Sequence, residues 1–243
     1  MSDSNTLISV KNLSAGYDNK KPVFKDLTFN IHENEVFGLI GLNGIGKTTL
    51  LKTILGLREP FSGTMTVEGE KGKKSNISYL PERFDPPWFL SGYEFIKFSL
   101  SLYKKTISYE EVADVAKQVS LNPDFLKKKV QSYSKGMRQK LGLLATVLTK
   151  CPLLILDEPM SGLDPKARFE IKSIILEAKK ERRSVFMSSH ILSDMAELCD
   201  RVAILHDGRF VFVGTPKEMS EAGGSKNMEE SFLHLIEPDK QAA

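Results

Sequence analysis

The sequence is poor in cysteine: Cys151 and Cys199 are the only two among 243 residues, and their spacing matches neither a metal site nor a redox dithiol. This argues against cysteine-based metal or redox chemistry and favours reduced thiols in the cytoplasm. Long apolar runs are also missing, because no stretch approaches the roughly 18 residues that a membrane helix needs. The first residues, MSDSNTLISV, lack the basic and then apolar pattern of a signal peptide. We therefore expect a cytoplasmic chain that spans no membrane, so any membrane role requires another subunit.

An excess of either charge is absent as well, since 34 basic residues stand against 31 acidic ones and the formal net charge is +3. This balance gives no electrostatic argument for nucleic acid, and we expect no nucleic-acid partner. Hydrophobic residues make up 41% and charged residues 27% of the chain, as in ordinary soluble globular proteins. The length leaves room for one large domain or two modest lobes.

Short apolar runs alternate with helical patterns, which favours a parallel α/β core. The runs EVFGLIG, LLILDEP and SVFMSSH predict buried strands, and Asp207-Gly208 predicts a hairpin between two further β runs. About the first thirty residues predict an antiparallel β flap, whereas a mainly helical stretch interrupts the alternation later in the chain. We expect one domain with a core of residues 1–82 and 150–220, a helical subdomain of residues 83–149, and a short C-terminal helix and tail at residues 221–243.

A phosphate loop is predicted by GLNGIGKTT, which fits G-x-x-x-x-G-K-[ST] directly after a strand and before a helix. Glycines in such a loop let backbone N–H groups surround phosphate oxygens, and the helix N-terminus favours their negative charge. Lys47 would reach the β- and γ-phosphates, and Thr48 would ligate Mg²⁺. The predicted nucleotide contacts in this loop are Gly41, Asn43, Gly44, Gly46, Lys47, Thr48 and Thr49.

A pair of carboxylates, Asp157 and Glu158, closes the LLIL strand, where α/β folds place groups that face a ligand. Asp157 suits a carboxylate linked to Mg²⁺, as a Walker B aspartate does. Glu158 suits a general base that orients or deprotonates the attacking water. A solvated strand end is the usual alternative for an isolated pair, and the phosphate loop in the same chain favours the catalytic interpretation.

A second anion-binding helix end is predicted by QSYSKGMRQKL, residues 131–141. Apolar side chains from Met137 to Leu148 fall on one face, so a helix begins near Ser134. Its free N–H groups, with the Ser134 hydroxyl and the small Gly136, form an anion site. A simple helix cap is the alternative for Ser-x-Gly alone.

The phosphate loop, YSKGMRQKL, LLILDEP, SGLD and SSH occur in the order and approximate spacing of the ATP-binding cassette (ABC) ATPases, and the chain resembles that family over nearly its whole length. The resemblance implies an α/β fold: a P-loop NTPase (RecA-like) core with an N-terminal antiparallel β flap and an inserted helical subdomain. It also implies ATP and Mg²⁺ as ligands and ATP hydrolysis coupled to transport. Two such domains would lie head to tail, with the signature helix of one capping the γ-phosphate held by the other.

By position, the resemblance gives Ser134 and Gly136 the role of signature contacts with the partner's nucleotide. Asp164, in SGLD, resembles the D-loop residue at the subunit junction, although it can also cap the helix that follows it. His190 resembles the switch histidine that touches the γ-phosphate, with an ordinary surface histidine as the alternative. Tyr17 takes the place of the aromatic that stacks on adenine, with packing on the β flap as its alternative.

Three positions depart from the family pattern. Glu82, in SYLPER, stands where many relatives carry the Q-loop glutamine; its carboxylate can meet Mg²⁺ or water but cannot donate a hydrogen bond. Lys135 replaces the first glycine of the usual signature, and Met137 replaces its glutamine. YLPE and YSKGM resemble the motif sequences of export-type ABC ATPases. We therefore interpret the changes as characteristic of that subfamily and expect an exporter.

Aromatic residues gather between residues 84 and 103, directly after the Q-loop position, where the family receives the coupling helix of a membrane subunit. We expect Phe95 and Phe98 to lie mostly in the core. The candidate partner contacts are Phe84, Trp88 and Phe89. The expected partner is a separate transmembrane permease subunit docking near Phe84–Phe89, which would make the chain peripheral on the cytoplasmic face of the cell membrane.

The second ATPase subunit is expected to be another copy of this chain, with a heterodimer as the alternative, because one chain carries a complete set of motifs. A soluble ABC ATPase acting on the ribosome or DNA is the alternative function. Such proteins commonly carry two cassettes, long coiled coils or basic extensions, and the sequence contains none of these. A GTPase is disfavoured because the guanine-reading N-K-x-D sequence is absent.

Overall fold

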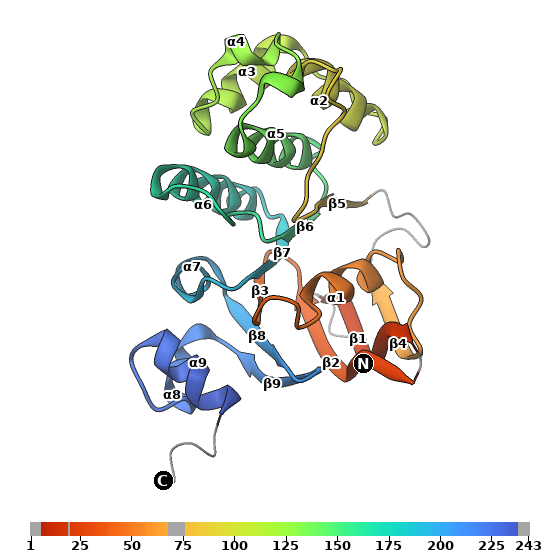
Figure 1. Ribbon diagram of the computed structural model, residues 1–243, viewed down its shortest axis with the longest axis vertical. Helices are drawn as coiled ribbons and strands as arrows, with labels where there is room; N and C mark the ends of the chain where they lie inside the picture. Colours follow the sequence, from red (N-terminus) through yellow and green to blue (C-terminus); the bar gives the residue numbers. More distant parts are fainter. Residues whose placement is uncertain (1–5, 19, 68–75, 238–243) are drawn as a thin grey trace. The chain divides into compact units, whose positions relative to one another are not determined.

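The computed structural model describes residues 6–18, 20–67 and 76–237 (Figure 1). The chain divides into two units, of which unit 1 comprises residues 1–74 and 184–243 and unit 2 comprises residues 75–183. The chain therefore begins unit 1, completes unit 2 and then returns to unit 1. The sequence instead predicts a core, an inserted helical subdomain and a C-terminal segment. That division differs from these two units and stays a prediction.

The strands of unit 1 form two groups. An antiparallel sheet has the order β2-β1-β4, formed by β1 (Thr6–Asp18), β2 (Lys21–His32) and β4 (Ser62–Val67). The second group has the order β7-β3-β8-β9, formed by β7 (Ser184–Ser189), β3 (Val36–Ile40), β8 (Arg201–His206) and β9 (Arg209–Gly214). The pairs β3–β7 and β3–β8 are parallel, and β9 is antiparallel to β8. The predicted antiparallel flap and parallel α/β core are thereby confirmed.

Sequence pattern explains these strands. Every residue of β3 and β7 is buried, as expected for apolar runs covered on both faces. Asp207 (φ 45°) and Gly208 (φ 71°) take the left-handed conformations that a two-residue hairpin needs, so the predicted turn between β8 and β9 is confirmed. The ring of Phe37 stacks on Phe29 at 5.6 Å and meets Phe186 edge-on at 5.6 Å, which joins the antiparallel sheet to the parallel strands.

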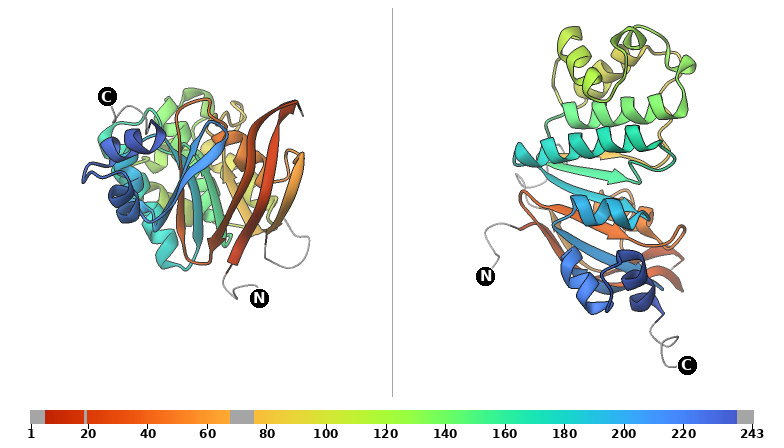
Figure 2. Two further views of the ribbon diagram at one scale, coloured as in Figure 1. Left: turned by 90° about the horizontal axis from the view of Figure 1, so that it is seen from below. Right: turned by 90° about the vertical axis from the view of Figure 1, so that its left-hand side faces the viewer.

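The helices of unit 1 are α1 (Lys47–Ile54), α7 (Leu192–Leu198), α8 (Pro216–Ala222) and α9 (Met228–Ile236). Figures 1 and 2 show α8 and α9 packed together beside β9. The sequence predicts one C-terminal helix, which corresponds to α9, whereas α8 is an additional helix that the sequence does not predict. Its start carries a full capping box, in which Thr215 and Glu218 exchange side-chain and backbone hydrogen bonds, with proline at the first helical position.

Unit 2 contains β5 (Ile77–Leu80) and β6 (Leu153–Asp157), which pair in parallel and place Tyr79 opposite Ile155. Its helices are α2 (Gly92–Ser101), α3 (Tyr109–Gln118), α4 (Pro123–Leu126), the 3₁₀ helix η2 (Val130–Ser132), α5 (Lys135–Leu148) and α6 (Pro165–Lys180). Figure 2 shows α5 and α6 lying side by side. The helical character expected between β5 and β6 is present.

One core prediction is wrong. Phe95 is buried as expected, but Phe98 is 52% exposed. Helix α2 turns the face that carries Phe95, Ile96 and Leu100 inward, and Phe98 points away from that face. Within the described part of the chain, no helix is both long and apolar enough to cross a bilayer.

Candidate nucleotide-binding site

The phosphate-loop sequence connects β3 to α1 in unit 1, in the strand–loop–helix order that the sequence predicts. Gly46 caps the N-terminus of α1 with φ +116°, a conformation that side-chain-bearing residues rarely adopt. A Cβ at this position would also lie 2.4 Å from Val23 Cγ1. Glycine is therefore required here both by the backbone conformation and by the close approach of β2.

Lys47 is the first residue of α1, and only 5% of it is exposed. Its ammonium donates hydrogen bonds to the carbonyl oxygens of Gly41 (2.7 Å) and Leu42 (3.2 Å). The side chain therefore folds back over the loop rather than reaching into bulk solvent. This geometry places a positive charge inside the curve of backbone N–H groups that would surround a phosphate.

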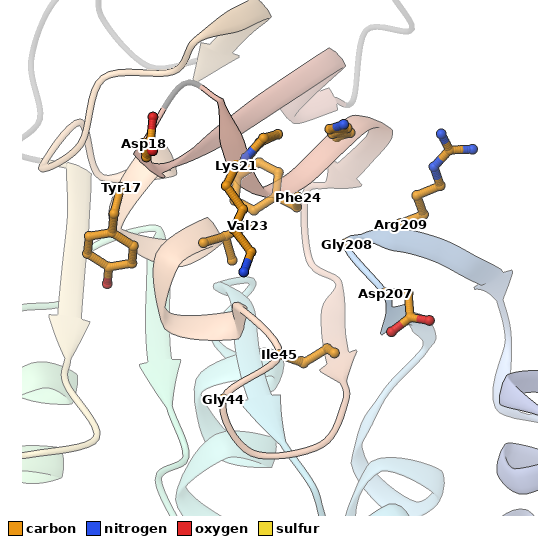
Figure 3. Close-up of a pocket in the computed structure, with 12 residues that line it drawn as sticks. Tyr17, Asp18, Lys21, Val23, Phe24, Gly44, Ile45, Asp207, Gly208 and Arg209 are labelled. Atoms are coloured by element: carbon orange, nitrogen blue, oxygen red, sulfur yellow. The ribbon is translucent and has the colours of Figure 1, made fainter.

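A cavity of about 750 Å³ lies beside the phosphate loop within unit 1. Figure 3 shows Tyr17 and Asp207 on opposite sides of it, with the Gly44–Ile45 backbone between them. Gly208 accepts a hydrogen bond from the backbone N–H of Lys25 at 2.8 Å, which attaches the β8–β9 hairpin to β2. The structure thus brings Tyr17 and the phosphate loop to one cavity large enough for a small ligand.

Tyr17, at the end of β1, is 74% exposed and lines this cavity. The predicted alternative, in which the ring packs on the β flap, requires burial that the structure does not have. Arg58 lies over the ring, with its guanidinium carbon 4.1 Å from the ring centroid. Arg58 gives no signal in the sequence, because it is remote from Tyr17 along the chain and belongs to no phosphate-binding motif.

The predicted catalytic carboxylates end β6 in unit 2. Asp157 is completely buried and Glu158 is 5% exposed. Glu158 has φ 49°, the left-handed region that residues other than glycine rarely occupy. Such a conformation costs on the order of 1–3 kcal/mol and is concentrated at functional sites. Ser161 N donates to Glu158 O at 3.1 Å, so the turn after the strand fixes this backbone.

Tyr79, on β5, accompanies these carboxylates and was not predicted from the sequence. The parallel pairing puts its side chain on the same sheet face as Ile155 and, two residues later, Asp157. Burial raises the pKa of Tyr79, and the nearby Asp157 and Glu82 carboxylates raise it further. The phenol therefore stays protonated at neutral pH, beside two residues predicted to meet Mg²⁺.

The predicted signature helix is α5, and Ser134 is its N-cap residue, so the helix begins where the sequence predicts. The Ser134 hydroxyl accepts a hydrogen bond from Met137 N at 3.2 Å, and both Ser134 and Lys135 are exposed. The segment before α6 lies close to this helix start, since a Cβ on Gly136 would lie 3.6 Å from Leu163 Cδ2. Gln139 Nε2 also donates to Pro159 O at 3.2 Å. Unit 2 therefore brings the two predicted subunit-junction segments together.

Asp164 caps α6, because its carboxylate accepts a hydrogen bond from Ala167 N at 2.9 Å. The predicted capping role is confirmed, and it leaves the D-loop role as a separate prediction. Glu82 is exposed, two residues beyond the end of β5, and His190 is exposed, one residue beyond the end of β7. Among the predicted site residues, Tyr17, residues 41–49 and His190 belong to unit 1, and the others belong to unit 2.

The predicted Mg²⁺ ligands are divided between the units, with Thr48 in unit 1 and Asp157 and Glu82 in unit 2. The described residues contain no group of three or more His, Cys, Asp or Glu side chains that could hold a metal ion. Mg²⁺ in nucleotide sites is usually held by one or two carboxylates or hydroxyls together with phosphate oxygens and water. The Thr48 hydroxyl and the Asp157 and Glu82 carboxylates are oxygen donors of that kind.

Two exposed aromatic residues of unit 2 lie next to the segment that contains three consecutive lysines, residues 127–129. Trp88 is 66% and Phe89 57% exposed, and the two rings meet edge-on at 5.8 Å. Gln131 N donates to Trp88 O at 3.2 Å, so the segments containing Trp88 and Lys129 run side by side. Phe84 differs from this pair, because it is partly buried and packs edge-on against Phe95 at 5.4 Å.

The phosphate loop between a parallel strand and a helix defines the chain as a P-loop NTPase. A family model described as ABC transporter matches residues 24–161, more than half of the chain. EcsA of Bacillus subtilis, an ABC-type transporter ATP-binding protein, is 34% identical over 96% of this chain and 98% of its own length. The chain belongs to the ABC transporter family of ATP-binding proteins.

Two further comparisons agree with this membership. A solved structure titled "Structure of ATP binding subunit of ABC transporter" superimposes with a TM-score of 0.85 at 32% identity, covering 95% of this chain and 99% of that one. An ABC transporter ATP-binding protein of Nostoc sp. is 36% identical over 86% of this chain. The chain spans 64% of the length of the Nostoc protein.

Proposed function

We propose that the chain binds and hydrolyses ATP as one of two ATPase subunits of an exporter and drives a separate membrane subunit. The observation that carries the proposal is the phosphate loop, with Gly46 at φ +116° and the buried Lys47 ammonium folded over its carbonyls. Membership in the ABC transporter family supports ATP as the nucleotide. The Tyr17 side of the cavity would take the base, and the phosphate loop would take the triphosphate.

Each predicted nucleotide contact in unit 1 then has one role. Lys47 neutralises the β- and γ-phosphates, and the backbone N–H groups from Gly44 to Thr49 donate to their oxygens. Thr48 offers its hydroxyl to Mg²⁺. The predicted contacts Gly41 and Asn43 shape the loop around the phosphate chain. Tyr17 stacks on adenine, which is favourable for an aromatic ring that is largely exposed in the cavity.

The proposed hydrolytic residues are Asp157, Glu158 and Glu82 of unit 2 and His190 of unit 1. Glu158 orients and deprotonates the attacking water, and its backbone at the end of β6 has the left-handed conformation found at functional sites. Asp157 and Glu82 would hold Mg²⁺, and His190 would donate to the γ-phosphate. When bound, Mg²⁺ would neutralise charge on the phosphate oxygens during the displacement.

Two chains would complete each other's sites. Ser134 and Gly136 lie at the exposed start of α5, whose first turn contains no acidic side chain. These N–H groups therefore present positive partial charge outward, as suits the γ-phosphate bound by a partner. Asp164 at the start of α6 would lie at the same junction. A homodimer is the simplest pairing because both halves of the site are encoded in one chain.

The membrane partner would dock on Trp88 and Phe89, two exposed aromatic residues of the kind enriched at interface centres. Phe84 is a weaker contact because it packs against Phe95. This docking would hold the subunit on the cytoplasmic face of the membrane. We expect Trp88→Ala with Phe89→Ala to move the chain from the sedimented membranes of its native cell to the supernatant. The control Phe98→Ala removes an exposed ring elsewhere in unit 2; equal sedimentation of all variants would contradict this docking surface.

Hydrolysis is tested with Glu158→Gln, which keeps the size of the side chain and removes its basicity. We expect ATP turnover to fall about 10²–10⁴-fold while ATP binding, measured by calorimetry, persists. Glu177→Gln on the exposed face of α6 is the matched control and should retain turnover. Undiminished hydrolysis by Glu158→Gln would refute the assignment of the base.

A further inference from the structure

Arg58 makes two contacts with the end of β1. Its guanidinium carbon lies 4.1 Å from the Tyr17 ring centroid, and its Nη1 donates to the carbonyl oxygen of Gly16 at 2.6 Å. Gly16 and Arg58 are 42 residues apart in the sequence. One side chain thus holds the backbone immediately before Tyr17 and also covers its ring.

The backbone around Arg58 is itself fixed to β1. Phe61 N donates to Ser14 O at 2.7 Å, and Ser62 pairs with Ser14 at the start of β4. On its other side, Arg58 follows α1, which begins at the phosphate loop. Arg58 therefore connects the helix that would bind phosphate with the ring that would bind the base.

The remaining surface of Tyr17 is open. Tyr17 is 74% exposed although a guanidinium lies over its ring, and the residue lines the cavity beside the phosphate loop. A planar guanidinium can cover only one face of the ring, so the opposite face remains available to a second planar group. The Nε of Arg58 is buried and has no hydrogen-bond partner among the described residues, so its place is set by the ring and Gly16 rather than by a full set of hydrogen bonds.

We propose that Arg58 is a positioning residue for the nucleotide base, holding one face of Tyr17 so that adenine stacks on the other. This inference rests on the proposed function, because it assigns a role within the same ATP site. A guanidinium is weakly hydrated and stacks readily on aromatic rings. With Arg58 in place, Tyr17 loses less rotational freedom when the base arrives, which raises affinity without any contact between Arg58 and the nucleotide.

Two other roles for Arg58 make different predictions. A direct contact with phosphate would make Arg58 important for any triphosphate, with or without a base. A purely structural role would lower stability and affect binding whether or not Tyr17 is present. The positioning role alone requires both a base in the ligand and a ring at residue 17.

The experiment measures binding of AMP-PNP and of inorganic tripolyphosphate to the full chain by calorimetry. We expect Arg58→Ala to weaken AMP-PNP binding about 3- to 10-fold and to leave tripolyphosphate binding unchanged. Arg58→Lys, which keeps the charge but loses the planar group, should fall between Arg58→Ala and wild type. In ATPase assays the KM for ATP should rise while kcat stays constant. Lys52→Ala removes a nearby positive charge from α1 and should change neither affinity.

A double-mutant cycle with Tyr17→Ala gives the decisive comparison, since Arg58→Ala should have no further effect once the ring is gone. An equal loss in the Tyr17→Ala background, a parallel loss of tripolyphosphate binding, or unchanged AMP-PNP binding by Arg58→Ala would each overturn the inference. Wild-type chain that bound neither ligand would instead refute the proposed function itself, and the inference with it. Thermal unfolding of each variant checks that the fold is retained, and Arg58→Lys provides the test if Arg58→Ala unfolds.

Discussion

Lys140 and Glu170 form a salt bridge between α5 and α6, with Nζ and Oε2 2.9 Å apart and side chains only 14% and 9% exposed. The other carboxylate oxygen of Glu170 accepts a hydrogen bond from the Ser120 hydroxyl. The proposed signature residue Ser134 is the N-cap of α5, and Asp164 is the N-cap of α6. The pair therefore joins the two helices whose first residues are proposed to meet the partner subunit.

Removing the negative charge of this pair should destabilise the chain. Glu170→Gln leaves the Lys140 ammonium without its counter-charge in a nearly buried place, and we expect about 1–3 kcal/mol loss in the free energy of unfolding. Urea unfolding followed by circular dichroism measures it. Glu177→Gln, on the exposed side of the same helix, should change stability by less than about 0.5 kcal/mol. Equal stability of the two variants would contradict a stabilising role for the pair.

The contribution of Glu170 should also depend on pH. Burial alone would raise the pKa of Glu170, but the Ser120 hydrogen bond and the Lys140 charge outweigh burial and lower it below its ordinary value of 4.5. A lowered pKa in the folded state means that the stabilisation is complete above the unfolded-state pKa and disappears as pH falls through the folded-state pKa. The stability difference between wild type and Glu170→Gln should therefore shrink below about pH 4.5. A difference that grew on acidification would contradict this direction.

Gly46 should tolerate substitution less well than Gly44. Both have positive φ, but a Cβ on Gly46 would meet Val23 Cγ1 at 2.4 Å, whereas one on Gly44 would meet nothing within 4 Å. We expect Gly46→Ala to lower ATP affinity and stability more than Gly44→Ala, which carries only the backbone cost of about 1–2 kcal/mol. Adding Val23→Ala should recover part of the Gly46→Ala defect by removing the clash. Equal effects of the two glycine substitutions would show that the contact with Val23 is unimportant.

Features with a local cause could be predicted from the sequence. The phosphate loop, the Asp207-Gly208 hairpin and the caps at Ser134 and Asp164 each depend on a few adjacent residues with defined backbone requirements. The start of α8 also had such a signal, proline after a capping threonine, but the short helix that follows has too little apolar periodicity to be recognised.

Features that depend on distant segments could not be predicted. The contact of Arg58 with Tyr17 and the pairing of Lys140 with Glu170 arise only when separate elements pack. The exposure of Phe98 has the same origin, since an aromatic-rich helix offers more than one apolar face and the neighbouring helices decide which face is buried. The unusual backbone of Glu158 is likewise a property of the folded turn rather than of its sequence.

The most direct measurement is the ATPase activity of mixed dimers made from Lys47→Ala chains and Gly136→Asp chains, each inactive alone. If every pocket joins the phosphate loop of one chain to the signature helix of the other, a mixed dimer contains one pocket with both defects and one with none. Random pairing should then restore roughly a quarter of wild-type turnover for independent sites. No restored activity in the mixture, or full activity of a strictly monomeric wild-type chain, would contradict the account.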